Sequence, residues 1–231
     1  MQEFELEGRV AAKVRGLISP TQTRAILPLP AVLGVVDVVL AKRMHTVIDT
    51  ISATCSRSFL EASRKGRQIL DITFPLTQVL EKGADEFGEA AVAQGDIKQF
   101  YDHIQPLKVA KWLSDNGLPW AESLTFLRLH SLPSIRLSVG QSFSKINDRT
   151  CGVLTGSRSA VAAGRVPVLD VALRRVHVWN QLAYRTDSRA FALAVFVDNL
   201  FSTGRDAWSA TSIIDDAAVH LKQHWGLELG Q

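Results

Sequence analysis

The segment RAFALAVFVDNLFSTG, residues 189–204, limits the possible folds of this chain more than any other stretch. Two apolar runs flank the polar pair Asp198–Asn199, and Asp and Asn are residues that tight turns favour. This pattern predicts a strand, a two-residue break at Asp198–Asn199, and a second strand that returns beside the first. The segment therefore indicates an antiparallel hairpin within a sheet.

A second strand candidate, AAVAQGD, covers residues 90–96 and is too short and too rich in small residues to form a helix of its own. It fits a buried strand that ends in Gly95 and Asp96. Further strands are expected within FLRLHSLPSIRLSVG, residues 126–140, because apolar and polar residues alternate there.

Helical apolar spacing predicts the remaining elements. Pro30 and Pro106 open two of the expected helices, and Gly83, Gly117 and Gly226 mark the ends of three. The helices are expected at residues 30–51, 69–83, 106–117, 158–179 with a break near Gly164–Pro167, and 206–226. Helices and strands in this order indicate an α+β domain with an antiparallel sheet.

Composition narrows the class of protein without giving a function. The 231 residues are 46% hydrophobic and 21% charged, which is ordinary for a globular protein with a core. A net charge of +3 is compatible with a polyanionic partner but does not identify one. Cys55 and Cys151 form no disulfide framework, so we expect a reducing, intracellular compartment, with nucleus and cytoplasm both open. No secretory signal is apparent, and the longest apolar run is interrupted by two prolines and an Asp, so no membrane association is expected.

Two acidic residues stand out at the ends of the predicted strands. Asp96 follows one strand, and Asp198 lies at the tip of the hairpin. If the strands are neighbours in one sheet, both carboxylates emerge at the same edge and repel each other unless a divalent cation lies between them. Mg²⁺ takes a few carboxylate ligands and leaves positions open for substrate phosphates. Two such ions can hold the attacking and leaving oxygens of a phosphoryl transfer in line.

Three short motifs resemble the palm motifs of reverse transcriptases, the RNA-directed DNA polymerases, of the group II intron and non-LTR retroelement type. They are DIKQFYD at residues 96–102, GVLTGSRS at 152–159 and FVDN at 196–199. Residues 23–44 and 58–82 resemble the family's fingers segments, and AAVHLKQHWGLELG, residues 217–230, resembles the helix and Gly-Leu strand that follow the third motif. The matches occur in the family's order.

The resemblance implies a division of the chain. Residues 1–89 would be a mainly helical fingers-like segment, and residues 90–231 a palm with an antiparallel sheet packed on helices. The chain stops at Gln231, where the family's thumb begins, so the thumb is expected to be absent and to come from another segment or chain.

The resemblance also implies roles for single residues. Asp96 and Asp198, with the Ile97 carbonyl, would bind Mg²⁺, with Mn²⁺ as the alternative ion, and Asn199 would complete the catalytic set. Contacts to the deoxynucleoside triphosphate are implied for Arg24, Tyr101, Gly156 and Ser157, and contacts to template or phosphate for Arg64 and Arg67. The partners would be an RNA template and a DNA primer.

The motifs also depart from the family pattern. Asn199 replaces the second Asp of the third motif, and an Asn can bind a metal through its carbonyl but brings no charge. Leu154 and Thr155 stand where the family has Pro and Gln. The leading hypothesis is therefore an RNA-directed DNA polymerase of a retroelement, as a truncated or degenerate copy. The alternatives are a catalytically inactive nucleic-acid-binding or scaffold remnant of the same fold, and another palm-fold enzyme such as a nucleotide cyclase.

Simpler interpretations stay open for the individual residues. Asp198–Asn199 also suits an ordinary hairpin turn, Tyr101 suits the core, and Arg64 and Arg67 suit a solvated turn. His220 and His224 are four residues apart on a predicted helix, but the sequence places no third metal ligand beside them.

Overall fold

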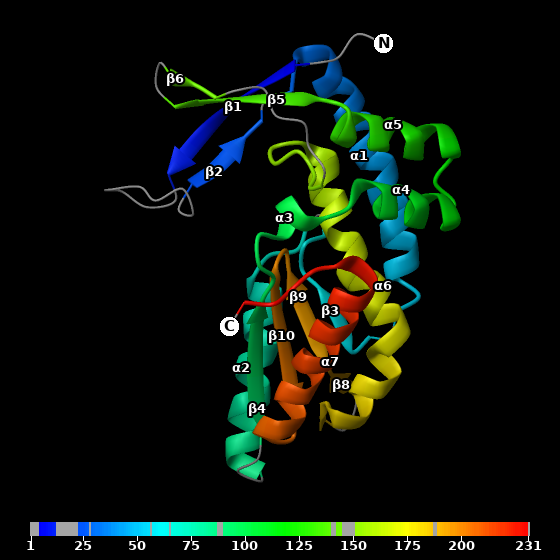
Figure 1. Cartoon of the computed structure of the whole chain (residues 1–231). Helices are drawn as coiled ribbons and strands as arrows, with labels where there is room; N and C mark the ends of the chain where they lie inside the picture. Colours follow the sequence, from blue (N-terminus) through cyan, green and yellow to red (C-terminus); the bar gives the residue numbers. More distant parts are fainter. Residues whose placement is uncertain are drawn as a thin grey trace. The chain divides into compact units, whose positions relative to one another are not determined.

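A computed structural model describes residues 5–12, 23–27, 29–55, 57–64, 66–86, 90–139, 142–144, 151–186 and 189–230 of the chain (Figure 1). The chain folds into two compact units. Unit 1 contains residues 1–47 and 101–163, and unit 2 contains residues 48–100 and 164–231. The resemblance divides the chain in another way, into a fingers segment at residues 1–89 and a palm at residues 90–231. That division rests on sequence motifs and stays a prediction.

Unit 2 is built on a four-stranded sheet with the strand order β3-β9-β10-β4. Its strands are β3 (Phe59–Glu61), β9 (Leu193–Phe196), β10 (Asn199–Gly204) and β4 (Ala91–Asp96). The pairs β9–β10 and β10–β4 are antiparallel, which confirms the expected hairpin and palm-type sheet. The parallel pair β3–β9 was not expected, so the sheet is mixed. A separate ribbon pairs β7 (Tyr184–Thr186) with β8 (Arg189–Phe191).

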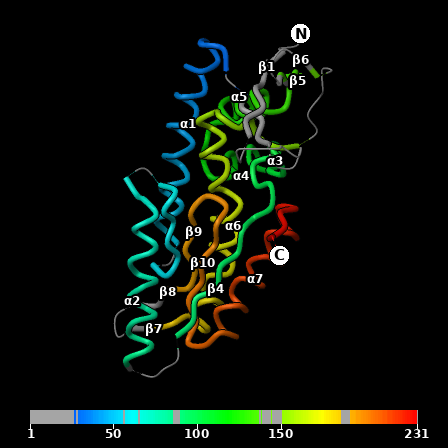
Figure 2. The backbone as a smooth tube through the Cα atoms, turned by 90° about the vertical axis from the view of Figure 1, so that its left-hand side faces the viewer, coloured from blue at the N-terminus to red at the C-terminus, as the bar shows by residue number. Residues whose placement is uncertain are grey.

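Helices α2 (Leu70–Glu86) and α7 (Ala207–Trp225) lie on opposite sides of this sheet (Figure 2). Alternate strand residues point to opposite faces, which explains how one strand packs against both helices. On the α2 side, Val92 and Phe201 pack with the cluster that includes Ile72 and Leu76. On the α7 side, the chain comes so close that a Cβ on Gly95 would lie 3.2 Å from the Ile214 Cγ2 atom. The sheet is therefore fixed by packing on both faces.

Local sequence sets both ends of α7. The Asp206 carboxylate accepts a hydrogen bond from the Ser209 N–H at 2.6 Å and caps the first turn. Gly226 has φ +71° and ends the helix in the left-handed conformation that glycine adopts without steric cost. The predicted end of this helix at Gly226 is confirmed.

Side-chain hydrogen bonds join α7 to α6 (Arg158–Leu182) within unit 2. The Asp216 carboxylate accepts from the Arg175 guanidinium at 2.7 and 2.9 Å and from the Trp179 indole N–H at 2.7 Å. Burial raises the pKa of Asp216, but the hydrogen bonds from Arg175 and Trp179 outweigh burial and hold this pKa below its ordinary value. The Trp225 indole donates in the same way to Asp170 at 3.1 Å.

Unit 1 has its own four-stranded sheet, in the order β2-β1-β5-β6, and several helices. The strands are β1 (Glu5–Ala12), β2 (Thr23–Ile26), β5 (Ser134–Val139) and β6 (Ser142–Phe143). The helices that contribute are α1 (Ala31–Ser52), α3 (Phe100–His103), α4 (Pro106–Asp115), α5 (Trp120–Ser131) and the start of α6. The predicted helices behind Pro30 and Pro106 are confirmed, whereas β1 and β2 were not predicted.

Two predicted breaks in helices are wrong. Helix α6 runs through Gly164 and Pro167 without interruption, and α2 continues past Gly83 to Glu86. A glycine costs a helix about 1 kcal/mol and a proline about 3 kcal/mol relative to alanine. Every residue of α6 from 162 to 172 is buried, so the apolar burial around its whole circumference outweighs that cost.

Residues 126–131 form the end of α5 and not a strand as predicted. Ser123, Phe126, Leu129 and His130 are buried at helical spacing, and this periodicity competes with the apparent alternation. Strand β5 begins only at Ser134. Within the described residues, no helix is both long enough and apolar enough to cross a membrane.

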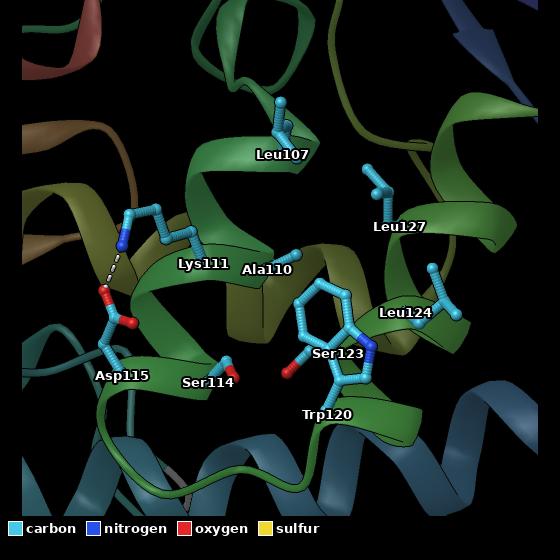
Figure 3. A pocket seen from close by; sticks show the side chains of 9 residues that line it. All are labelled: Leu107, Ala110, Lys111, Ser114, Asp115, Trp120, Ser123, Leu124 and Leu127. Carbon is cyan, nitrogen blue, oxygen red and sulfur yellow. Dashed lines mark hydrogen bonds and ion pairs between the residues drawn. The ribbon is translucent and has the colours of Figure 1, made fainter.

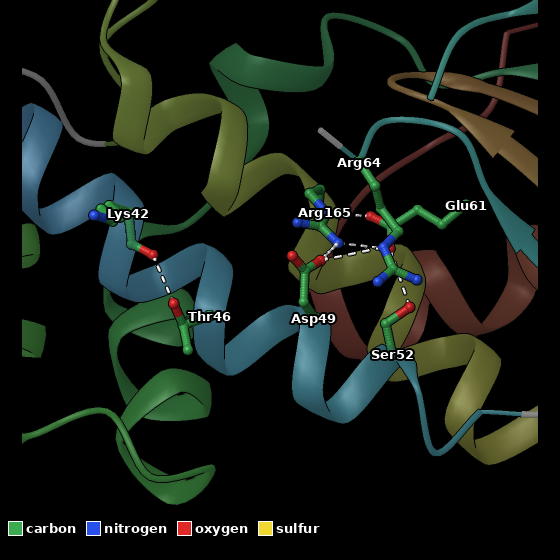
Figure 4. Close-up of polar contacts among 7 residues, drawn as sticks. All are labelled: Lys42, Thr46, Asp49, Ser52, Glu61, Arg64 and Arg165. Atoms are coloured by element: carbon green, nitrogen blue, oxygen red, sulfur yellow. Dashed lines mark hydrogen bonds and ion pairs between the residues drawn. The ribbon is translucent and has the colours of Figure 1, made fainter. Parts of the chain in front are cut away.

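The guanidinium of Arg165 is the centre of a buried polar network in unit 2 (Figure 4). It donates to both Glu61 carboxylate oxygens and, at 2.6 Å, to the Asp49 carboxylate, and the side chains of Arg165 and Glu61 are only 2% and 4% exposed. Burial alone would lower the pKa of Arg165, but Glu61 and Asp49 outweigh burial and raise this pKa above its ordinary value.

Replacing Arg165 by methionine should lower the free energy of unfolding by about 3–5 kcal/mol, because Glu61 would keep a buried charge without its cation. Equilibrium urea denaturation followed by tryptophan fluorescence measures this change. The control is Lys111→Met, which removes the cation of an exposed pair with Asp115 and should cost less than about 1 kcal/mol. Equal losses in the two variants would contradict the prediction.

Candidate active site

The two acidic residues singled out by the sequence lie at the same end of the unit 2 sheet. Asp96 is the last residue of β4, and its register partner on β10 is Asn199. Asp198 precedes Asn199 in the two-residue loop between β9 and β10. The Ile97 N–H donates a hydrogen bond to the Asp198 carbonyl at 2.9 Å, which ties the end of β4 to this loop.

The loop itself differs by one residue from the prediction. It consists of Val197 and Asp198, and Asn199 already belongs to β10, opposite both Asp96 and Phe196. Moving the loop to Asp198–Asn199 would shift the register and send the buried Leu200 and its neighbours to the wrong faces of the sheet. Core packing therefore overrides the turn preference of Asn199.

Both polar atoms of the Asn199 side chain have hydrogen-bond partners. Its amide nitrogen donates to the Asp198 Oδ1 atom at 3.1 Å, and its amide oxygen accepts from the Gln94 amide at 3.4 Å. In this arrangement Asn199 orients the Asp198 carboxylate, and its place in the catalytic set stays a prediction. Strand β4 is also an edge strand with only Gly95 buried, and not the fully buried strand that was predicted.

The two carboxylates are accessible. Asp96 is exposed and Asp198 half-buried, and none of the ion pairs within the described residues involves either of them. The described part of the chain contains no group of three or more His, Cys, Asp or Glu side chains that would hold a metal ion. A cation at this end of the sheet would therefore have two carboxylates at most and would need oxygen ligands from elsewhere.

The segment after α7 lies directly beside Asp96. Ile97 pairs with Leu229 in an isolated bridge, and the Gly230 N–H donates to the Asp96 carbonyl at 2.6 Å. A Cβ on Gly230 would lie 3.9 Å from the Asp96 Oδ2 atom, so the glycine keeps that side of the carboxylate open. The backbone hydrogen bonds on either side of this bridge are donated by the Lys98 and Gly230 N–H groups.

The predicted nucleotide contacts Gly156 and Ser157 of the second motif, and Tyr101 of the first, belong to unit 1. Gly156 is exposed with φ +106°, a backbone conformation that favours glycine. Ser157 is buried and caps α6, because its hydroxyl accepts from the Ala160 N–H at 3.0 Å. The Tyr101 side chain is half-buried, and its carbonyl accepts from the Val153 N–H at 2.8 Å. The roles assigned to these residues stay predictions.

The predicted phosphate contacts are engaged with carboxylates. The Arg64 guanidinium lies 3.3 Å from the Asp49 carboxylate, and the Arg67 guanidinium lies 3.3 Å from the Asp71 carboxylate. Arg24 belongs to β2, where its backbone pairs with Ala11, but its side chain lies outside the described residues.

A buried polar chain that the sequence did not reveal supports the second motif within unit 1. The Leu154 N–H donates to His130 Nδ1 at 3.0 Å, and His130 Nε2 lies 2.9 Å from the Ser159 hydroxyl. The Ser159 hydroxyl and the N–H groups of Arg158 and Ser159 all donate to the Asp37 carboxylate. A single acidic residue inside the valine-rich run GVVDVVLA was the one signal that pointed to this arrangement.

An open groove of about 290 Å³ lies between helices α4 and α5 of unit 1 (Figure 3). Its walls are largely apolar, with Leu107, Trp120 and Leu127 among the lining residues, and the Lys111–Asp115 ion pair lies at its edge. The buried Ser123 hydroxyl has no hydrogen-bond partner within the described residues. The groove contains none of the residues predicted for a catalytic site.

No protein-family model and no curated protein sequence matches the chain. Solved structures do. The telomerase of Candida albicans, in complex with a TWJ fragment of telomeric RNA, matches 99% of this chain with a TM-score of 0.65 and 11% identity, over 42% of the telomerase chain. The telomerase of Candida tropicalis, also in complex with a TWJ fragment of telomeric RNA, matches 100% of the present chain with a TM-score of 0.64 and 9% identity. The match covers 40% of the telomerase chain.

An RNA-dependent RNA polymerase, vp4, matches 98% of the chain with a TM-score of 0.57 and 11% identity, over 20% of its own length. The chain thus spans less than half the length of each of these structures. At these identities the likeness concerns the fold, and it does not single out the group II intron and non-LTR type. The chain has an α+β fold of the kind found in nucleic-acid polymerases.

Replacing Asp37 by alanine should lower the free energy of unfolding by about 2–3 kcal/mol, because it leaves the N–H groups in the first turn of α6 without an acceptor. Urea denaturation of the full chain measures the loss. The control Asp115→Ala removes an exposed carboxylate of the same type and should cost less than about 1 kcal/mol. A loss for Asp37→Ala no larger than that of the control would show that the cap contributes little.

Proposed function

We propose that this chain is the fingers-and-palm part of an RNA-directed DNA polymerase of a retroelement, as a degenerate copy whose motifs depart from the family pattern. The observation that carries the proposal is the pairing of Asp96 with Asn199, which brings Asp96 and Asp198 to one end of a polymerase-like sheet. Template-directed nucleotidyl transfer needs two such carboxylates where the nucleotide phosphates lie. The order of the three motifs along the chain gives further support.

The donor atoms at this end of the sheet fit Mg²⁺, or Mn²⁺ in its place. Asp96 offers an exposed carboxylate, Asp198 offers the oxygen that Asn199 does not contact, and the Ile97 carbonyl is adjacent. These are oxygen ligands, which hard divalent cations prefer, and Mg²⁺ sites of this kind combine one or two carboxylates with substrate phosphates. When bound, the ion would activate the primer hydroxyl and neutralise charge on the phosphates.

The chain's own residues would orient this site. Asn199 holds one Asp198 oxygen and Gln94 holds Asn199, so the Asp198 carboxylate is directed before any ligand arrives. Gly230 leaves space beside Asp96 Oδ2. Orienting the carboxylates before the cation binds is useful here, because two carboxylates repel each other when no cation is bound.

The proposed partners are an RNA template, a DNA primer and deoxynucleoside triphosphates. Arg64 and Arg67 are candidates for contact with phosphates, because exposed ion pairs such as theirs contribute little and an anionic partner can displace them. The Candida telomerases are themselves solved with a fragment of telomeric RNA. Binding should weaken steeply with added salt.

A second candidate is a catalytically inactive, nucleic-acid-binding remnant of the same fold. Asn199 favours it, since this residue brings no negative charge and its amide oxygen already faces Gln94. Both candidates share the sheet and its packing. They differ in whether Asp96 and Asp198 bind a cation and support nucleotide addition.

Primer extension on an RNA template with Mg²⁺ or Mn²⁺ separates the two candidates. Asp96→Asn and Asp198→Asn should each lower the extension rate about 10²–10³-fold, the range for losing one electrostatic group beside the reacting oxygens. Asp115→Asn, an equal charge change on the exposed face of α4, should leave the rate unchanged. Salt-sensitive RNA binding without any extension by the unmodified chain would favour the remnant.

A further inference from the structure

We propose that Ser63 is a positioning residue for Asp198, because its hydroxyl holds the loop between β9 and β10 in a conformation that this loop would otherwise avoid. The proposal rests on the proposed function, in which Asp198 binds a divalent cation. Ser63 lies within residues 58–82, which resemble a fingers segment, but the resemblance implied no role for it.

The backbone around the two carboxylates is unusual. Within the described residues, only Gln99 and Val197 combine a side chain with a positive φ, at +44° and +59°. Val197 directly precedes Asp198, and Gln99 follows Asp96 by three residues. A β-branched residue avoids this region, because its side chain crowds the following carbonyl. Conformations of this kind persist only where the surroundings impose them, and they gather at functional sites.

The contact that holds this conformation comes from Ser63, which follows the end of β3. The Val197 N–H donates to the Ser63 hydroxyl oxygen at 2.8 Å. The parallel ladder between β3 and β9 pairs Glu61 with Val195 and continues with the Ala62 N–H donating to the Val195 carbonyl at 3.0 Å. Where the backbone ladder ends, the Ser63 side chain takes its place. The chain after the parallel strand β3 thus brings a hydroxyl to the loop between β9 and β10.

Fixing Val197 fixes the residue that follows it. The Asp198 carbonyl accepts from the Ile97 N–H, and its carboxylate accepts from Asn199. Ser63 therefore holds Val197, the residue that precedes Asp198, whereas Ile97 and Asn199 form hydrogen bonds with Asp198 itself. Without the Ser63 hydroxyl, the Val197 N–H loses its acceptor and the loop can relax to a negative φ, which turns the Asp198 carboxylate away from its present direction.

Removing the Ser63 hydroxyl should weaken cation binding without unfolding the chain. For Ser63→Ala we expect the dissociation constant for Mn²⁺, measured by electron paramagnetic resonance of the free ion, to rise about 10–100-fold, the range for losing a group that orients a ligand. Hydrogen exchange of the Val197 amide should become faster. Ser63→Thr keeps the hydroxyl and should restore both properties.

The matched control is Ser52→Ala in the same unit, where the hydroxyl donates to the Glu61 carboxylate at 3.2 Å. It should leave the Mn²⁺ dissociation constant within twofold and Val197 exchange unchanged, even if its melting temperature falls as far as that of Ser63→Ala. Normal Mn²⁺ binding by Ser63→Ala would overturn the positioning role alone. An unmodified chain that binds no Mn²⁺ would refute the proposed function together with this role.

Discussion

The pairing of β4 with β10, in the register that sets Asp96 opposite Asn199, is the constraint on which the candidate site depends. A slip of one residue would send Asp96 to the opposite face of the sheet. Packing prevents the slip, because Gly95 must face Ile214 on one side while Phe201 joins the apolar cluster beside α2 on the other. The core therefore decides where the acidic residues meet, although neither acidic side chain belongs to the core.

The carboxylates discussed above fall into two groups that differ in their hydrogen bonds and ion pairs. Asp37, Glu61 and Asp216 each accept several hydrogen bonds, as buried or half-buried carboxylates must if the fold is to tolerate them. Asp96 and Asp198 take part in none of the ion pairs of the described residues, and the Asp198 carboxylate accepts its hydrogen bond from the neighbouring Asn199. The first group stabilises helices and joins elements, so its roles are structural. The second group lies beside the loop in which Val197 has a positive φ, and it forms the proposed cation site.

Elements with strong local signals were predictable. The hairpin followed from two apolar runs, and α4 and α7 followed from Pro106 and Gly226. Elements whose stability comes from burial were not: α6 continues through Pro167, and residues 126–131 extend α5, because packing outweighs the local preference in both places. At the candidate site, the placement of Asp96 and Asp198 at the same end of the sheet was predicted. The hydrogen bonds around Asp198, which involve Asn199, Gln94 and Ser63, were not predicted, because side-chain contacts between distant segments leave no periodic pattern.

The sequence by itself determined the elements whose residues carry their own signals, and with them an α+β class and two acidic residues at strand ends. Only the tertiary structure decided that the loop consists of Val197 and Asp198, that β3 joins the sheet in parallel, and that Asn199 faces Asp198. The physical reason is one of range. Turn preferences and capping act between neighbours in the chain, whereas register and side-chain orientation are set by contacts between residues more than a hundred positions apart, such as Gln94 and Asn199 or Ser63 and Val197.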